Sequence, residues 1–296
     1  MVRGASVRLE TPNGFAIERK MITREHRLAF DRGRCLGCDL CPAVCPQRAI
    51  QLVPGAVSEG RLTVRPSIDI DPARCNFCGE CVVLCPTHAL SLAVDGQARL
   101  PILEMDVFPR LEQEIAVAVA ACSPDCGLAC QPACPREAIA VHAERDAEGR
   151  VQAILDVAID RDLCTYCTRC AVACPTGALT VRQPWRGRIR LLAERCPAGC
   201  RACADLCPNQ ALTVQEGRVV LDERFCTFCG GCRQVCPSEG ALTVLRSGVR
   251  HAPIRSGAWY EALEKLVSPV ALAQDLEAIA HARRRRNLAY LPDVKT

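Results

Sequence analysis

The sequence predicts an α+β protein made of three tandem modules, each with short β-hairpins and helical turns, followed by a C-terminal helical tail. Two repeating patterns lead to this expectation: six groups of four cysteines, and an alternating apolar run after every group. The third observation is compositional, because aromatic residues make up only 4% of the 296 residues while 24 are cysteines. A chain with so few aromatic side chains must be ordered by something else, and metal binding by cysteine can supply that order.

The first 34 residues form a cysteine-free N-terminal extension with eight basic and four acidic side chains. They contain no apolar stretch of signal-peptide length, and the longest apolar run elsewhere, residues 115–122, is far shorter than the roughly 18 residues of a membrane span. We therefore expect a cytoplasmic protein that does not span a membrane and keeps its cysteines reduced. The extension can pack on the first module or on a partner.

The cysteines share one spacing and leave none over, and we number their groups one to six in chain order. Groups one, two, four and six read C-x2-C-x2-C-x3-C-P, whereas groups three and five have longer spacings, C-x3-C-x3-C-x3-C-P and C-x3-C-x2-C-x3-C-P. The groups are Cys35, Cys38, Cys41 and Cys45; Cys75, Cys78, Cys81 and Cys85; Cys122, Cys126, Cys130 and Cys134; Cys164, Cys167, Cys170 and Cys174; Cys196, Cys200, Cys203 and Cys207; and Cys226, Cys229, Cys232 and Cys236. Such self-similarity is typical of an array of one repeated unit.

This spacing favours iron–sulfur cubanes over two other uses of cysteine. Three thiolates on one tight loop can bind three irons of a single cubane, while the fourth, in a helical turn that proline ends, faces away toward a second cluster. Disulfides are disfavoured because closely spaced cysteines pair under strain and no secretion signal is present. Structural zinc sites usually combine two separated CxxC pairs, although a zinc-structured scaffold remains an alternative.

The segments between the groups predict hairpins. Each Cys-Pro is followed by a short turn and an alternating run such as AIQLV or ALTVQ, and most runs lead through a polar turn into a second run. The segments QEGRVVLDERFC and AEGRVQAILDVAIDRDLC show this arrangement, with glycine in the turn. Phe77, Tyr166 and Phe228 occupy the same loop position in three groups, where we expect them to pack over a cluster rather than carry electrons.

Residues 35–244 resemble bacterial-type two-cluster ferredoxins repeated in tandem, the polyferredoxin family. The resemblance implies six [4Fe–4S] clusters in three modules, 35–100, 101–186 and 187–246, preceded by the extension 1–34 and followed by the tail 247–296. In such ferredoxins the last cysteine of each group binds the other cluster of the pair. The implied ligand sets are Cys35, Cys38, Cys41 and Cys85; Cys75, Cys78, Cys81 and Cys45; Cys122, Cys126, Cys130 and Cys174; Cys164, Cys167, Cys170 and Cys134; Cys196, Cys200, Cys203 and Cys236; and Cys226, Cys229, Cys232 and Cys207.

No catalytic constellation accompanies the cysteines, so we expect a non-catalytic electron conductor. The C-x3-C-x2-C of group five matches radical-SAM enzymes, but that chemistry needs an open iron and a surrounding barrel, and here Cys207-Pro follows in ferredoxin register. No phosphate-binding glycine loop is present. His26, His88, His142, His251 and His281 are scattered without metal-ligand spacing. An enzyme would show turnover in isolation, and a zinc scaffold would be colourless and redox-silent.

The expected partners are catalytic subunits of a redox complex and other iron–sulfur proteins such as ferredoxins. The opening FAIERKMITREHRLAFDRGRCLGCDLCPAVCPQRAI resembles most the polyferredoxin subunits of formylmethanofuran dehydrogenases, with hydrogenase and heterodisulfide reductase complexes as alternatives. Nucleic acid is not an expected partner, because thiolates holding clusters would make the chain acidic despite its formal charge of +4.

The cysteine-free tail predicts a helix over 257–292 that Pro269 interrupts, with basic residues near its end. We expect the segment after Ser256 to dock on a redox partner through Trp259, Tyr260, Tyr290 and Arg283–Arg286, since interfaces favour aromatic and arginine anchors. The competing arrangement is that the tail wraps back over the modules.

Overall fold

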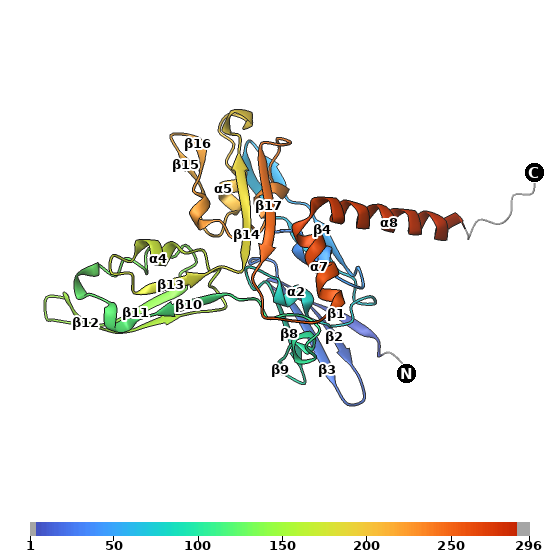
Figure 1. The fold of residues 1–296 in the computed structure, drawn as a ribbon, viewed down its shortest axis with the longest axis horizontal. Helices are drawn as coiled ribbons and strands as arrows, with labels where there is room; N and C mark the ends of the chain where they lie inside the picture. Colours follow the sequence, from blue (N-terminus) through green and yellow to red (C-terminus); the bar gives the residue numbers. More distant parts are fainter. Residues whose placement is uncertain (1–3, 289–296) are drawn as a thin grey trace, which may run out of the picture.

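The computed structural model describes residues 4–288, and these form three small modules that radiate from a common centre, with a long helix projecting from one side (Figure 1). Each module follows one plan. An outer strand leads into a cysteine loop, a hairpin leads into the second cysteine loop, and a last strand returns to pair with the first. We call these modules one, two and three in chain order.

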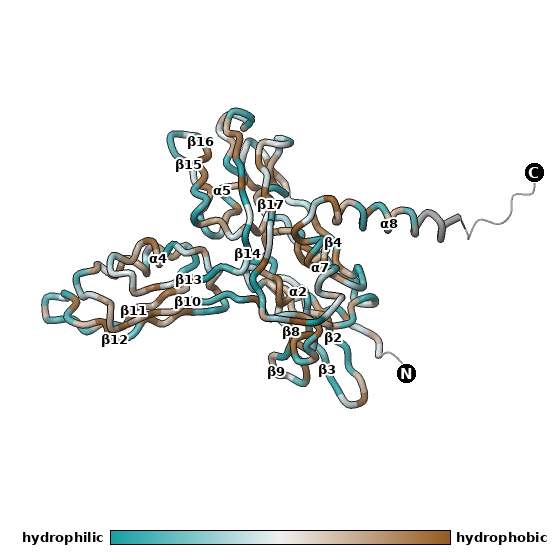
Figure 2. The backbone as a smooth tube through the Cα atoms, in the orientation of Figure 1, coloured by the Kyte–Doolittle hydropathy of each residue, from teal (hydrophilic) through white to brown (hydrophobic). Residues whose placement is uncertain are grey.

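All strand pairs of the modules are antiparallel. The outer pairs are β3 (Glu25–Asp31) with β8 (Leu90–Val94), β10 (Glu114–Val117) with β13 (Leu179–Arg182), and β14 (Trp185–Leu191) with β17 (Leu242–Val249); the inner hairpins are β4 (Ile50–Val53) with β7 (Ser67–Ile70), β11 (Ile139–Arg145) with β12 (Val151–Ile159), and β15 (Leu212–Gln215) with β16 (Arg218–Leu221). The predicted hairpins are therefore the inner pairs, and the tips of β11–β12 and β15–β16 are hydrophilic (Figure 2).

A short helix stands between the second and fourth cysteines of every group except group three. These helices are α1 (Leu40–Val44), α2 (Glu80–Val83), α4 (Arg169–Ala173), α5 (Ala202–Leu206) and α6 (Gly231–Gln234). Each ends at or just before the Cys-Pro pair, because proline disfavours helical backbone in the residue before it. The longer group three instead contains the 3-10 turn η2 (Pro124–Cys126). Similar turns, η1 (Val119–Ala121), η3 (Ala193–Arg195) and η4 (Glu223–Phe225), precede groups three, five and six.

The N-terminal extension is part of module one. Its strands β1 (Ser6–Thr11) and β2 (Gly14–Lys20) join β3, β8 and β9 (Gln97–Ala98) in a five-stranded sheet of order β1-β2-β3-β8-β9. Phe15 and Phe30 from this sheet are buried in the same apolar cluster as Cys35 and Cys81. The boundary expected at Cys35 therefore falls inside a packed unit, because β3 supplies the first strand of the module.

Two further elements connect the modules. A second hairpin, β5 (Ala56–Ser58) with β6 (Arg61–Val64), extends from the inner hairpin of module one and lies against group five, where the Arg201 amide donates to the Gly60 carbonyl at 2.7 Å. After β9, helix α3 (Pro101–Glu104) leads toward module two, and Leu111 forms an isolated bridge with His251 beyond β17. No described helix is sufficiently long and apolar to cross a membrane.

The C-terminal segment forms α7 (Gly257–Val267) and α8 (Pro269–Leu288), with the break at Pro269 that the sequence predicts. Trp259 on α7 is fully buried: its ring stacks edge-on against Phe108 at 4.7 Å, and its Nε1 donates to His251 Nε2 at 3.2 Å. The expectation that Trp259 anchors a partner is therefore wrong, because this chain already covers it. Tyr260 is exposed and donates its hydroxyl to the Ile254 carbonyl.

Helix α8 differs from α7 because it projects away from the modules (Figure 1). Val270 and Leu276 on it are largely exposed. Tyr290 lies outside the described residues, and the side chains of Arg283–Arg286 are not among those described. The intramolecular arrangement thus holds for α7, while docking of α8 on a partner stays a prediction.

Candidate metal centres

The cysteine loops are turned by left-handed backbone conformations at matching positions. In the four regular groups these positions immediately precede and follow the second cysteine: Gly37 and Asp39, Phe77 and Gly79, Tyr166 and Thr168, and Phe228 and Gly230. Successive amides in such turns form concave nests that attract anions. The loops are therefore suited to surround a negatively charged group held by thiolates.

The structure brings cysteines from both groups of a module together. In module one, a cavity is lined by Cys35, Cys38 and Cys41 of group one and by Cys81 and Cys85 of group two, whereas Cys45 is absent from its lining. A second cavity, in module three, is lined by Cys226, Cys229 and Cys232 together with Cys207. In these two cavities Cys85 and Cys207, each the last cysteine of its group, lie beside three cysteines of the other group, and the six crossed ligand sets stay a prediction.

Electrostatic contacts likewise bring thiols of the two groups close together in all three modules. Burial raises the pKa of Cys78, Cys170 and Cys203 to about 12. Among the further causes is the thiolate of a cysteine from the other group of the module, namely Cys45, Cys134 and Cys236, respectively. Burial also raises the pKa of Cys130, with Cys174 among the neighbouring thiols that add to the shift.

These pKa shifts explain why the sites need a cation. Ionising several buried thiols close together is costly, because each thiolate loses hydration and repels the next. A bound iron cluster supplies positive charge that offsets both costs and keeps the sulfurs deprotonated. All 24 cysteines lie within the described residues, and each is a free thiol rather than half of a disulfide.

The fourth cysteine of a group is held by a backbone amide four residues later. Cys45, Cys85 and Cys134 accept from the amides of Ala49, Ala89 and Ala138, with N–Sγ distances of 3.3, 3.2 and 3.3 Å. The alanines at this position are at most 3% exposed. The repeated Cys-Pro-x-x-Ala pattern was visible in the sequence, but its role as an amide donor was missed.

Zinc and a cubane place different demands on four thiolates. A four-thiolate zinc site needs every sulfur about 2.3 Å from the same atom, whereas each sulfur of a cubane site binds a different iron. Within residues 4–288, no three His, Cys, Asp or Glu side chains lie close enough to share one metal ion.

The aromatic rings of the loops are packing residues. Phe77 is 3% exposed, with its ring 5.6 Å from His26, while the Arg19 guanidinium lies 4.8 Å from its centroid. Tyr166 and Phe228 are likewise buried. This arrangement agrees with the packing role predicted for the three rings.

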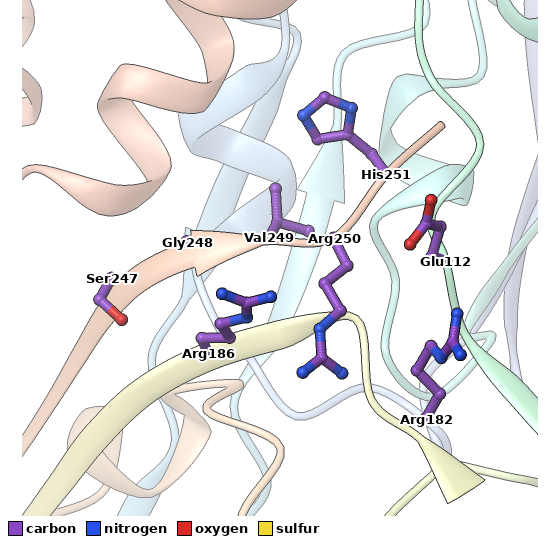
Figure 3. Close-up of a pocket in the computed structure, with 8 residues that line it drawn as sticks. All are labelled: Glu112, Arg182, Arg186, Ser247, Gly248, Val249, Arg250 and His251. Carbon is purple, nitrogen blue, oxygen red and sulfur yellow. The ribbon is translucent and has the colours of Figure 1, made fainter. Parts of the chain in front are cut away.

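One open cleft contains no cysteine (Figure 3). It occupies about 550 Å³ where modules two and three meet, and Arg182, Arg186 and Arg250 line it with Glu112 at one side. These arginines were not predicted as site residues from the sequence, although the alternation in WRGRIRL places Arg186 on one face of a strand with Arg188 and Arg190. The cleft is a basic surface feature rather than a seventh metal site.

Comparison with known proteins gives one family and two relatives. The profile of the 4Fe-4S dicluster domain matches residues 34–89, 121–178 and 195–240. The polyferredoxin protein FwdF of Methanocaldococcus jannaschii is 42% identical over 106 residues, which are 36% of this chain and 29% of that protein. The chain thus spans under a third of the length of that curated relative.

A solved structure resembles nearly the whole chain. It is a chain of the formate dehydrogenase–heterodisulfide reductase–formylmethanofuran dehydrogenase complex from Methanospirillum hungatei, with a TM-score of 0.77 and 28% sequence identity. The match covers 90% of this chain and 92% of that one. The similarity therefore includes the arrangement of the modules and not only their individual folds.

Proposed function

Because the chain belongs to the 4Fe-4S dicluster domain family, present in three tandem copies, we propose that it is a non-catalytic electron-transfer subunit of an oxidoreductase complex. It holds six [4Fe–4S] clusters, two in each copy of the domain. The observation that carries the proposal is the meeting of cysteines from both groups of a module in one cavity, seen in modules one and three, which supports six crossed cysteine quartets.

The clusters supply one-electron redox chemistry, and the chain supplies their surroundings. The thiols hold the irons, the alanine amides donate to the ligand sulfurs, and the apolar residues of each module limit access of water. Hydrogen bonds to sulfur and burial are the main protein contributions to the reduction potential of such centres. The proposed ligands are the 24 cysteines in the six crossed sets named above.

The comparisons favour one kind of partner. The relatives are a polyferredoxin named FwdF and a chain of a complex that contains formylmethanofuran dehydrogenase and heterodisulfide reductase. We propose that this chain assembles with the catalytic subunits of a complex of this type, with a hydrogenase-linked complex as the alternative. Reduced thiols and this context favour a cytoplasmic location. The exposed residues of α8 make it the candidate docking element.

Metal analysis tests the cofactor and its role together. Anoxically purified protein should contain about 24 iron and 24 sulfide per chain, four of each for every cysteine quartet, and should accept electrons at low potential. About six zinc atoms without sulfide would instead identify a zinc scaffold. Full iron content without reversible reduction would contradict the electron-transfer role.

A further inference from the structure

We propose that the cysteine loops of groups one, four and six form a three-way hub, so that the six clusters make a branched network rather than a wire in sequence order. Groups two, three and five then stand at the ends of three arms. Two positioning residues hold these loops together: Arg246 joins groups one and six, and Asn209 joins groups four and six. This inference rests on the proposed electron-transfer function.

Arg246 joins the loops of groups one and six. Its Nε donates to the Phe228 carbonyl at 2.9 Å, and its Nη2 donates to the carbonyls of Cys229 at 2.5 Å and Cys38 at 3.4 Å. The side chain is only 12% exposed and lies 3.6 Å from Asp39. One guanidinium therefore binds loops that are almost 200 residues apart in sequence, with its charge balanced by Asp39.

The backbones of these two loops also touch directly. A Cβ atom added to Gly231 would lie 2.8 Å from the Leu36 carbonyl oxygen, a distance that ordinary Cβ contacts do not reach. Leu36 also lines the cysteine cavity of group six. Glycine at position 231 is what lets the loop of module three approach the loop of module one so closely.

Asn209 joins the loops of groups four and six. Thr165 Oγ1 donates to Asn209 Oδ1 at 2.6 Å, and Asn209 Nδ2 donates to Thr227 Oγ1 at 2.9 Å. All three side chains are at most 6% exposed. Because Thr165 follows Cys164 and Thr227 follows Cys226, this buried chain of hydrogen bonds runs from one cysteine loop to the other. Buried and satisfied polar networks of this kind fix a single packing arrangement.

A second layer of contacts supports the same side of the hub. Arg169, beside Cys170, donates to the carbonyls of Asn209 at 2.7 Å and Gln210 at 2.6 Å. Its guanidinium lies 4.2 Å from the centre of the Phe225 ring. Thr168 Oγ1 donates to the Arg224 carbonyl at 3.0 Å. Modules two and three thus meet through residues adjacent to ligands in both.

The third side of the hub joins groups one and four. Arg34, which precedes Cys35, donates to the Asp162 carbonyl two residues before Cys164, at 3.0 Å. Arg34, Asp162 and His88 line one cleft between modules one and two. His88 lies three residues after Cys85, which is the crossed ligand proposed for group one. The two loops therefore face each other across this cleft.

The other three groups lie away from this junction. In group two, the Cys75 carbonyl accepts from Arg19 and the Cys78 carbonyl from the Ile102 amide, both within or just after module one. Group three lies in the arm of module two, where η2 packs on β12. Group five is covered by the β5–β6 hairpin, which carries no cysteine. Each outer group therefore exchanges electrons with the other modules through the inner group of its own module, because none of these contacts joins it to a cysteine loop of another module.

Electron transfer between two clusters of this network needs no further reactant. One electron leaves a reduced cluster and reduces one oxidised neighbour, while no bond forms or breaks and no proton is required. The hub changes only which clusters are neighbours. A donor at any arm can then supply acceptors at both other arms.

Deleting single clusters separates the hub from a wire in sequence order. A ruthenium polypyridyl photoreductant is attached at Gln97→Cys, an exposed position on β9, the strand that follows group two. With a sacrificial amine as the electron source it supplies one electron per laser flash to dilute, anoxic, full-length chains, and the flashes are repeated until the fast phase is complete. EPR spin counting then gives the number of clusters reduced in the fast phase. A variant lacking the group three cluster (Cys122→Ala with Cys126→Ala) is compared with one lacking the group four cluster (Cys164→Ala with Cys167→Ala).

The two arrangements predict different counts. With the hub, loss of the group three cluster leaves all five others connected, and loss of the group four cluster isolates only group three and leaves four. A wire in sequence order would leave two clusters connected to the photoreductant after loss of the group three cluster, and three after loss of the group four cluster. Counts of two and three in protein with the expected iron content would overturn the hub alone. Unlabelled wild-type protein that lacks iron or cannot be reduced would overturn the proposed function instead.

The positioning residues are tested by substitutions that remove no ligand. Arg246→Met combined with Asn209→Ala should keep the iron content but remove groups five and six from the fast phase, which lowers the count from six to four. Arg246→Lys in place of Met should restore part of the loss. Arg188→Met with Gln215→Ala, two exposed residues of module three, is the matched control and should keep six. A count of six in the first variant, or loss of its iron, would overturn the assignment of these residues.

Discussion

Replacing Trp259 by alanine should detach α7 from the modules. The side chain is fully buried, its ring contacts Phe108 at 4.7 Å and His251 at 5.1 Å, and it donates a hydrogen bond to His251. Truncating a buried tryptophan to alanine costs about 3–5 kcal/mol, which already includes the lost aromatic contacts. The half-buried His251 keeps access to water and adds little. We therefore expect about 4 kcal/mol less stability for the docking of α7.

Hydrogen exchange measures this loss segment by segment. About 1.4 kcal/mol corresponds to a tenfold change in the opening equilibrium, so amide protection in α7 should fall by about a thousandfold. The fall is smaller if the docking of α7 is itself worth less than about 4 kcal/mol. Cysteine loops and iron content should not change, because no ligand is touched. Tyr260→Ala is the matched control, since that neighbour is 54% exposed and should cost no more than about 1 kcal/mol. Equal effects of the two substitutions would refute the packing argument.

Two further predictions concern ligation and docking. The first uses a chain that has lost the group one cluster through Cys35→Ala with Cys38→Ala. Adding Cys85→Ser to it should cost no more iron, whereas adding Cys45→Ser should perturb the group two cluster and cost up to four further irons. The opposite pattern would show that ligation is not crossed. Deleting the chain from Pro269 onward should leave iron content and reducibility unchanged but abolish co-purification with the partner subunits, because α8 projects from the modules while α7 remains packed; unchanged co-purification would exclude α8 as the docking element.

The sequence predicted the features that depend on nearby residues. The cysteine groups and the inner hairpins follow from spacings and glycine turns within about 20 residues. The outer strand pairs could not be predicted in this way: Phe30 pairs with Leu90 and Arg190 with Thr243, and alternation within one strand does not identify a partner some 50 or 60 residues away. The same distance explains why β3 was assigned to an extension rather than to module one.

The error at Trp259 has a similar cause. A tryptophan in a cysteine-free segment looks unpartnered when only neighbouring residues are considered. Its actual partners are Phe108, about 150 residues earlier, and His251 in the segment before α7. Asn209 and Arg246 were missed for a different reason, since each is an ordinary polar residue until the loops of two modules come together around it.

The hub gives a physical reason for the two longer cysteine spacings. Extra residues occur only in groups three and five, both of which are outer groups, whereas the three hub loops all keep the compact C-x2-C-x2-C spacing. At the hub, the Gly231 position leaves 2.8 Å between an added Cβ and the Leu36 carbonyl, so that a longer loop would collide with its neighbour. In group three, an added Cβ at Gly127 would meet nothing within 4 Å. Loop length is therefore constrained where the hub loops meet, whereas the group three loop has room for another residue at Gly127.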